Sequence, residues 1–276
     1  MTAVSGNGNV VMTESGRIHR CYGAVNRGWR IMMTGVCFAL FGLGGLLLSL
    51  VWFNLLLLVV RDAERRRRMA RRSISCSFRL FLYCCRRSGV FDYRIEGAEL
   101  LARDRCCLVV ANHPSLLDYV LLASVMPEAD CLVKAGLLKN PFVCGAIRAA
   151  DYLVNSQGET LLAESQQRLD QGDAIILFPE GTRTRYGEAL KLQRGAANLA
   201  VRCGCDLRLV HIICTQRMLD KQSRWYQVPL AKPLFTVRVQ QRIASQPFIA
   251  GEGDMQPRAV RHLTQYLQHA LTPEHQ

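Results

Sequence analysis

The strongest constraint on this chain is a run of thirty residues, 31–60, that contains no charged side chain. A straight helix of that length would extend about 45 Å, whereas the hydrocarbon core of a bilayer is about 30 Å thick. The run is too long for the apolar part of a signal peptide, and arginines rather than a small-residue cleavage site follow it. We therefore predict a membrane anchor over residues 31–60, preceded by a polar segment over residues 1–30.

Glycines near the middle of the anchor leave its shape open. Residues 42–45 read Gly-Leu-Gly-Gly. Glycine is common in helices that span membranes, so these residues are compatible with one long tilted span. They are equally compatible with a re-entrant hairpin of two short helices that are hinged at the glycines and enter one leaflet.

A basic segment follows the anchor. Residues 61–87 contain ten arginines against only Asp62 and Glu64, which accounts for +8 of the formal net charge of +13. Positive charge beside an apolar segment marks the cytoplasmic side of a membrane and attracts anionic headgroups. We interpret residues 61–90 as an interfacial segment. Because the basic excess is local, the composition argues against a chain that binds nucleic acid over its whole surface.

From residue 92 to about residue 245, strand-like and helix-like segments alternate, and we predict that residues 91–276 form one domain. The predicted strands cover residues 92–96, 106–111, 131–134, 151–154, 173–178, 207–214 and 235–243. The predicted helices cover residues 116–125, 159–171, 191–203 and 258–271, and residues 246–256 are predicted to form a loop. Alternation of this kind is typical of an α/β fold in which helices flank a mixed sheet.

The twelve cysteines do not predict disulfides or a metal site. Several lie in apolar segments as adjacent pairs, and no Cys-x-x-Cys pair occurs. Cys203 and Cys205 flank one glycine and could chelate a metal, although small residues in a turn explain them equally well. We expect free thiols in a reducing compartment and no bound metal.

Candidate catalytic residues lie where a buried strand meets a helix. The apolar run 106–111 precedes residues 112–118, which read Asn-His-Pro-Ser-Leu-Leu-Asp. Ser115 is a plausible N-cap for the following helix, which places His113 on the turn. Asp118 lies about one helical turn further on and can reach the imidazole. A carboxylate on one ring nitrogen fixes the tautomer and leaves the other nitrogen free to take a proton.

A second motif, Phe-Pro-Glu-Gly-Thr-Arg at residues 178–183, follows another buried strand. Together, the two motifs resemble those of the glycerophosphate and lysophosphatidic acid acyltransferase superfamily. The resemblance spans roughly residues 90–215 and includes Lys134 in a middle block and Arg194 after the second motif. It implies a membrane enzyme that transfers a fatty acyl group from acyl-CoA or acyl carrier protein to a hydroxyl. No cofactor is implied beyond that co-substrate.

The resemblance assigns a role to each motif residue. His113 would be the catalytic base and Asp118 the residue that orients it. The acceptor would be bound by a set of residues from the second motif and its neighbours: Glu180, Gly181, Thr182, Arg183, Lys134 and Arg194. Among these, Gly181 permits close backbone approach, and Arg183 can bind a phosphate through two hydrogen bonds.

Two positions depart from the family pattern. The middle block of the family often ends in an acid–arginine pair, where this chain has Asn155-Ser156, with Arg148 several residues earlier. A family strand that usually carries Val-Pro here reads Val210-His211. The catalytic half is thus intact and the phosphate-binding half is weakened.

Several functions remain open from the sequence. The chain is expected to acylate a lysophospholipid-type acceptor such as lysophosphatidic acid, or else a phosphate-free lipid or a polyketide-like product by the same chemistry. A non-catalytic membrane adaptor and a serine hydrolase that uses Ser115 are alternatives, although no Gly-x-Ser-x-Gly elbow occurs. Expected partners are membrane lipids, the acyl donor and the acceptor. The expected location is a bacterial inner membrane with the catalytic domain on its cytoplasmic face.

Overall fold

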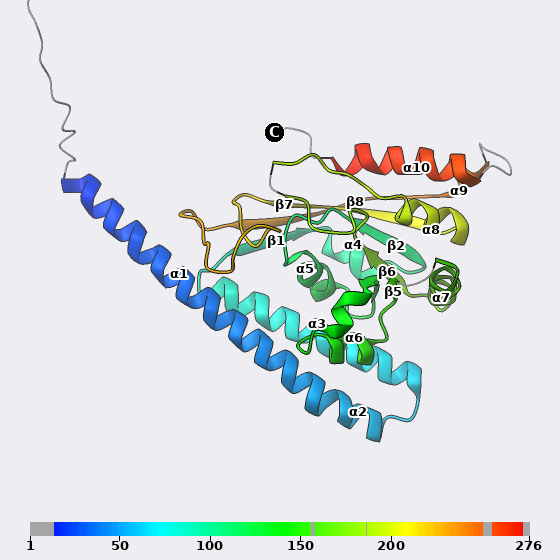
Figure 1. Cartoon of the computed structure of the whole chain (residues 1–276), viewed down its shortest axis with the longest axis horizontal. Helices are drawn as coiled ribbons and strands as arrows, with labels where there is room; N and C mark the ends of the chain where they lie inside the picture. Colours follow the sequence, from blue (N-terminus) through cyan, green and yellow to red (C-terminus); the bar gives the residue numbers. More distant parts are fainter. Residues whose placement is uncertain (1–13, 156–157, 186, 251–255, 273–276) are drawn as a thin grey trace, which may run out of the picture.

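The computed structural model describes residues 14–155, 158–185, 187–250 and 256–272. Its centre is a six-stranded sheet in the order β1-β8-β7-β2-β6-β3 (Figure 1). The strands are β1 Asp92–Glu96, β2 Cys107–Ala111, β3 Asp130–Cys131, β6 Ala174–Leu177, β7 Asp206–Cys214 and β8 Leu234–Ile243. Neighbouring strands run parallel except β7 and β8, so the predicted mixed sheet is confirmed.

Helices cover both faces of this sheet because its central strands are apolar on both sides. Along β2, Leu108 and Val110 face one hydrophobic cluster, whereas Cys107, Val109 and Ala111 face the other. The first cluster is closed by α7 Gly158–Asp170, α8 Gly195–Cys203 and α10 Gln256–Leu271. The second is closed by α3 Ala63–Arg87, α4 Ala98–Arg103 and α5 Asp118–Val125.

The elements that the sequence did not predict are short. They include α4, α6 Cys144–Ala150, α9 Gln246–Ala250 and the 3₁₀ helix η2 Ala135–Lys139. The predicted strand 131–134 is divided between β3 in the main sheet and β4 Val133–Lys134, which pairs with β5 Val154–Asn155 in a separate two-stranded sheet. The division occurs because the Leu132 N–H donates to the Ile176 carbonyl of the main sheet, whereas the Val133 N–H donates to the Leu153 carbonyl beside β5.

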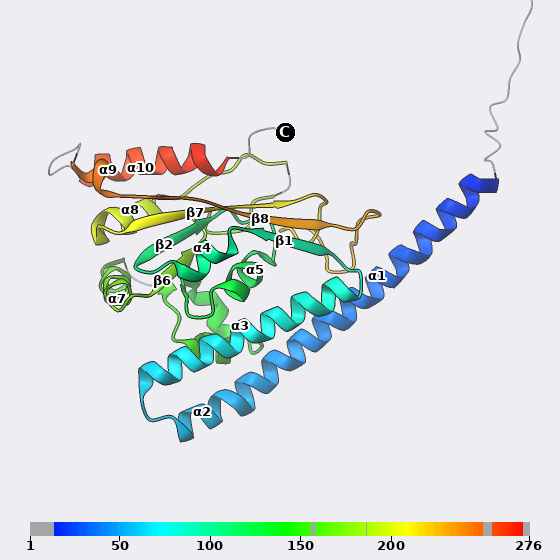
Figure 2. The same ribbon diagram turned by 180° about the vertical axis from the view of Figure 1, so that it is seen from behind.

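The apolar N-terminal segment forms one continuous helical rod. It consists of α1 Glu14–Leu47, the π-helical turn η1 Leu48–Trp52 and α2 Phe53–Val59. The chain then reverses, and α3 returns alongside the rod (Figures 1 and 2). Of the two shapes that the sequence left open, the structure has the continuous one, because the helix passes through the glycines at 42–45 unbroken. Gly45 instead makes room for a neighbour, since a Cβ there would lie 3.3 Å from the Phe142 carbonyl oxygen.

The rod has two different faces. Its buried side chains recur every three or four residues and pack on the domain: Arg30, Thr34, Cys37, Phe53 and Leu56. The opposite face exposes large apolar side chains: Val25, Trp29, Met32, Val36, Leu40, Leu43, Leu47, Leu50, Val51, Leu55, Leu57, Leu58 and Val59. By length and composition, the helix over Gly23–Val59 could cross a membrane.

The basic segment is only partly interfacial. Arg67 and Arg71 lie on the face of α3 that packs against the domain, and both are buried. The Arg71 guanidinium lies 2.5 Å from Asp130 and 2.9 Å from Asp173 and donates to the Ala150 carbonyl. The interpretation of residues 61–90 as an interfacial segment is therefore wrong for these two arginines, which hold α3 onto the sheet.

Candidate active site

The two residues predicted to form a catalytic pair lie together at the end of β2. The Nδ1 atom of His113 is 2.8 Å from Oδ2 of Asp118, whose side chain is fully buried. The Ser115 N–H donates to Oδ2 at 2.7 Å and the Ser115 hydroxyl donates to Oδ1 at 2.8 Å. With both carboxylate oxygens occupied, Asp118 fixes the imidazole so that Nδ1 carries its hydrogen and Nε2 presents a lone pair.

Burial sets the electrostatics of this pair. Loss of solvent raises the pKa of Asp118, and the hydrogen bonds from His113 and Ser115 oppose that shift. A carboxylate in such a place is best stabilised when the imidazole beside it becomes positively charged. The carboxylate thus lies fully buried behind the imidazole, whereas the His113 side chain remains 21% exposed.

Ser115 does not cap α5 as predicted. The helix begins at Asp118, after Leu117. The Ser115 hydroxyl instead accepts from the Leu117 N–H at 3.0 Å while it donates to Asp118. It is buried and contacts the carboxylate rather than the imidazole, so no base is placed to activate it as a nucleophile.

Glu180 joins the two motif loops. Its Oε1 accepts from the His113 N–H at 2.6 Å, and its Oε2 accepts from the Thr184 hydroxyl. The Thr184 N–H in turn donates to the His113 carbonyl at 3.0 Å. Burial raises the pKa of Glu180, and these hydrogen bonds oppose the shift. Its contacts thus orient the loops around His113, and we assign Glu180 to positioning.

Two further residues of the motifs position the site without having been predicted to do so. Phe178 stacks on the His113 ring with centroids 4.3 Å apart. The Asn112 side chain donates to the Ile212 carbonyl at 2.8 Å and accepts from its N–H at 2.6 Å, which continues the β2–β7 pairing by one residue. No local pattern could have indicated a partner one hundred residues away.

The remaining residues of the second motif surround a tight turn. Gly181 has a φ of +67°, a backbone conformation that favours glycine, and a Cβ there would lie 2.9 Å from the end of the Gln193 side chain. Thr182 is exposed. Arg183 is half-buried, and its Nη1 donates to the carbonyls of Leu219 and Asp220 at 3.1 and 3.0 Å. Within the described residues, its Nε and Nη2 make no hydrogen bond.

Two predicted binding residues are not brought to the catalytic pair. Lys134 is exposed on β4, and Arg194 is exposed at the start of α8. Neither side chain has a contact with His113 or Asp118 in the described part of the chain. Ser156, where the family pattern departs, lies outside the described residues.

The other departure, His211, is a buried member of β7. It lies opposite Arg238 of β8, and its Nε2 has no hydrogen-bond partner among the described residues. Burial, with a smaller contribution from Arg238, lowers the pKa of His211. A neutral imidazole results, so His211 supplies no cation for a substrate.

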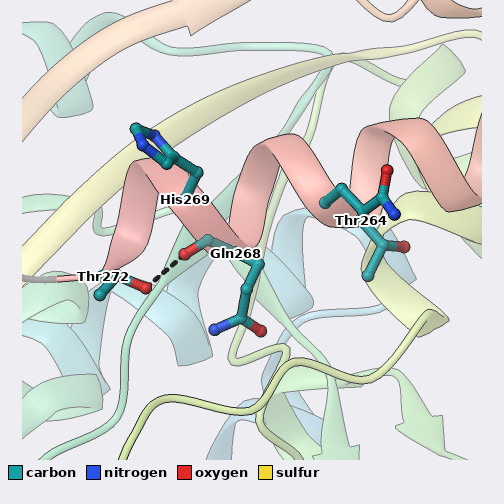
Figure 3. A pocket seen from close by; sticks show the side chains of 5 residues that line it. Thr264, Gln268, His269 and Thr272 are labelled. Atoms are coloured by element: carbon teal, nitrogen blue, oxygen red, sulfur yellow. Dashed lines mark hydrogen bonds between the residues drawn. The ribbon is translucent and has the colours of Figure 1, made fainter.

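The described residues contain no group of three or more His, Cys, Asp or Glu side chains that could hold a metal ion. Cys205 is buried, and burial raises the pKa of its thiol to about 12. A hollow of about 460 Å³ runs along α10, lined by Thr264, Gln265, Gln268, His269 and Thr272 (Figure 3). It contains no residue of either motif and is separate from the catalytic pair.

Part of this chain is similar to known acyltransferases. Residues 92–215 match the acyltransferase family. The 1-acyl-sn-glycerol-3-phosphate acyltransferase of Helicobacter pylori is 32% identical over 140 residues, which cover 48% of this chain and 54% of that protein. The enzyme of the same name from Pseudomonas aeruginosa is 27% identical over 180 residues, covering 63% of this chain and 65% of the relative.

A solved structure shares the fold. The crystal structure of the 1-acyl-sn-glycerophosphate (LPA) acyltransferase PlsC from Thermotoga maritima superposes with a TM-score of 0.61 at 22% identity. The match covers 88% of this chain and 97% of that one. By contrast, the chain spans about half the length of the curated relative from Helicobacter pylori.

Proposed function

We propose that this chain, whose residues 92–215 match the acyltransferase family, is a membrane-bound enzyme that acylates a lysophosphatidic acid-like acceptor. The observation that carries the proposal is the catalytic pair. A fully buried Asp118 holds Nδ1 of His113, and Nε2 faces away from the carboxylate. A non-catalytic adaptor would not need an imidazole held in this way, and the contacts of Ser115 argue against a serine hydrolase.

The reaction follows from this geometry. Nε2 of His113 takes the proton from the acceptor hydroxyl as its oxygen attacks the thioester carbonyl of acyl-CoA or acyl carrier protein. A C–O bond forms, the C–S bond breaks, and the departing thiolate receives the proton from the imidazolium. Asp118 stabilises the imidazolium between these steps, and no covalent acyl-enzyme is required.

Arg183 is the cation best placed to bind the acceptor's phosphate. It adjoins Thr184, whose N–H donates to the His113 carbonyl, and its Nη1 shares the Leu219 carbonyl with the Leu116 N–H, so the guanidinium lies close to the first motif. Its Nη1 is occupied by two backbone carbonyls, and the edge formed by Nε and Nη2 remains for a ligand. Such an edge matches two oxygens of a phosphate.

This role can be tested by Arg183→Lys. We expect the KM for lysophosphatidic acid to rise by about 10-fold or more, because an ammonium cannot reproduce a planar pair of charge-assisted hydrogen bonds. Steady-state kinetics of the purified protein would measure it, with Arg185→Lys as the matched control, because Arg185 is exposed and pairs with Glu188. A wild-type protein that acylates monoacylglycerol but not lysophosphatidic acid would favour the phosphate-free acceptor instead.

The rod formed by α1, η1 and α2 supports attachment along the membrane surface rather than a free-standing span. One face packs on the catalytic domain from Arg30 to Leu56, and the opposite face is apolar and exposed. A helix that crossed the bilayer would draw the attached domain into the hydrocarbon. We therefore propose that the exposed face enters one leaflet while the domain remains outside it, with exposed arginines of α3 at the headgroups.

Substitution of Leu47, Leu50 and Leu58 with Gln should weaken vesicle binding by roughly 100-fold or more, since each buried leucine contributes about 1.5–3 kcal/mol. High salt should release little of the wild-type protein, because only the arginine contribution is screened. Vesicle sedimentation measures both effects. Release of the wild-type protein by high salt would contradict the proposal. Protection of an N-terminal tag from external protease on sealed vesicles would also contradict it, because the N-terminus would then lie across the membrane.

A further inference from the structure

The loop between β7 and β8, residues 215–233, contacts both motifs at one point. The Leu219 carbonyl accepts from the Leu116 N–H of the first motif at 3.0 Å and from Arg183 Nη1 of the second at 3.1 Å. The next carbonyl, that of Asp220, accepts from the same Nη1 at 3.0 Å. Two consecutive carbonyls of this loop thus determine the direction of the Arg183 guanidinium.

These carbonyls converge because the backbone takes an unfavourable conformation. Leu219 has a φ of +55°, a region that residues other than glycine, asparagine and aspartate rarely adopt. Its side chain is buried in the core beside Met218. Core packing and the neighbouring turn must therefore hold Leu219 in place, since its own preference is for another conformation.

The side chain of Asp220 builds that turn. Its Oδ1 accepts from the Gln222 N–H at 3.0 Å and from both the N–H and the hydroxyl of Ser223 at 2.5 Å. Its Oδ2 accepts from Arg217 Nε at 2.7 Å. This is the geometry by which an aspartate closes a turn on its own backbone. The carboxyl group is buried although it lies in a surface loop.

The far end of the same loop is fixed to α1. Arg27 Nε donates to the Val228 carbonyl and Arg30 Nη1 to the Ala231 carbonyl, both at 3.0 Å. A Cβ on Gly35 would lie 3.1 Å from the Trp225 ring. The loop lies beside α1 in both views (Figures 1 and 2). It is therefore held at one end by the N-terminal rod and at the other by the Asp220 turn.

We propose that Asp220 is a positioning residue that aims Arg183 at the phosphate of the acceptor. Its carboxylate holds the turn, the turn sets the Leu219 and Asp220 carbonyls, and these bind Nη1 so that the Nε–Nη2 edge faces the substrate. This inference rests on the proposed function for the identity of the ligand. The positioning of Arg183 itself rests only on the hydrogen bonds.

A pair of variants separates this role from general stability. Asp220→Ala removes every side-chain acceptor in the turn. Asp220→Asn keeps Oδ1 for the Gln222 and Ser223 donors and loses the Oδ2 acceptor and the charge toward Arg217, whose side chain is exposed. For Asp220→Ala, we expect the KM for lysophosphatidic acid to rise on the order of 10-fold, with kcat and the KM for the acyl donor nearly unchanged. Asp220→Asn should restore most of the acceptor KM.

The reactivity of Arg183 gives a readout that does not depend on turnover. Phenylglyoxal modifies arginines, and peptide mass spectrometry locates the product. Modification of Arg183 should be several-fold faster in Asp220→Ala than in the wild type or in Asp220→Asn. Asp206→Ala is the matched control, because Asp206 is the carboxylate at the start of β7 and pairs with Arg242 away from the site.

The outcomes are distinguishable. An unchanged rate of Arg183 modification in Asp220→Ala would overturn the inference. A fall in kcat accompanied by equal rises in the KM values for the acceptor and the acyl donor would also overturn it. If the wild-type protein fails to acylate lysophosphatidic acid while the modification contrast persists, the proposed acceptor is wrong and the positioning of Arg183 stands.

Discussion

Acyl transfer by a His113→Ala protein is expected to fall by about 10²–10⁴-fold, the usual cost of losing a general base. The fold should survive, because among the described residues the imidazole hydrogen-bonds only to Asp118 and stacks only on Phe178. Asp118 would keep the two donors of Ser115. The measurements are kcat/KM for the acceptor and the thermal unfolding midpoint.

Two companion variants make this result specific. Asp118→Asn should cost less than His113→Ala, because the base remains but its tautomer and its charge stabilisation are lost. Ser115→Ala should lower activity only through the orientation of Asp118. Wild-type turnover by a folded His113→Ala protein would refute the assignment, and trapping of Ser115 by a serine-reactive phosphonate would favour a hydrolase.

The largest expected effect on stability comes from Arg71. Its side chain and that of Asp130 are 1% and 0% exposed, so Arg71→Met removes the closer of the two cations of a buried carboxylate and leaves only Arg168, at 3.4 Å. Breaking a buried pair from one side typically costs about 3–5 kcal/mol of unfolding free energy. Urea unfolding measures the loss. The double variant with Asp130→Asn should recover part of it, since the uncompensated charge is then removed.

The pH dependence of this loss has a definite sign. Burial raises the pKa of Asp130 to about 6 even with Arg71 beside it, and removal of the cation raises that pKa further. The penalty should therefore shrink as the pH falls toward about 6, because a protonated carboxyl group needs no cation. Arg68→Met, at an exposed pair with Glu64, should cost less than about 1 kcal/mol. A similarly small loss of unfolding free energy for Arg71→Met would contradict the stabilising role given to the buried Arg71–Asp130 pair.

Local patterns accounted for much of the fold. The alternation of apolar strands and amphipathic helices predicted the mixed sheet, and five of its six strands lie within a few residues of their predicted positions. The thirty uncharged residues predicted a long apolar helix, and Gly23–Val59 forms one. These signals succeed because backbone geometry repeats over a few residues. The spacing of His113 and Asp118 across a strand-to-helix turn similarly implied their contact.

Long-range contacts decided the rest. The basic run could not reveal that Arg71 is buried, because its partners Asp130 and Asp173 lie 59 and 102 residues further along. The glycines at 42–45 left a hinge open, yet the helix is continuous through them, and a Cβ on Gly45 would lie 3.3 Å from the Phe142 carbonyl oxygen. The type of a residue limits the conformations and contacts that are open to it. Its neighbours in space determine which of these conformations and contacts is stable.

The candidate site divides in the same way. The sequence by itself determined the chemical groups at the site, a histidine, a carboxylate and an arginine in two ordered motifs. Only the tertiary structure decided that Glu180 binds the backbone of His113, that Asn112 binds Ile212, and that Leu219 fixes Arg183. The physical reason is that each of these hydrogen bonds joins segments brought together by the packing of the sheet, and no local sequence signal specifies such a pairing.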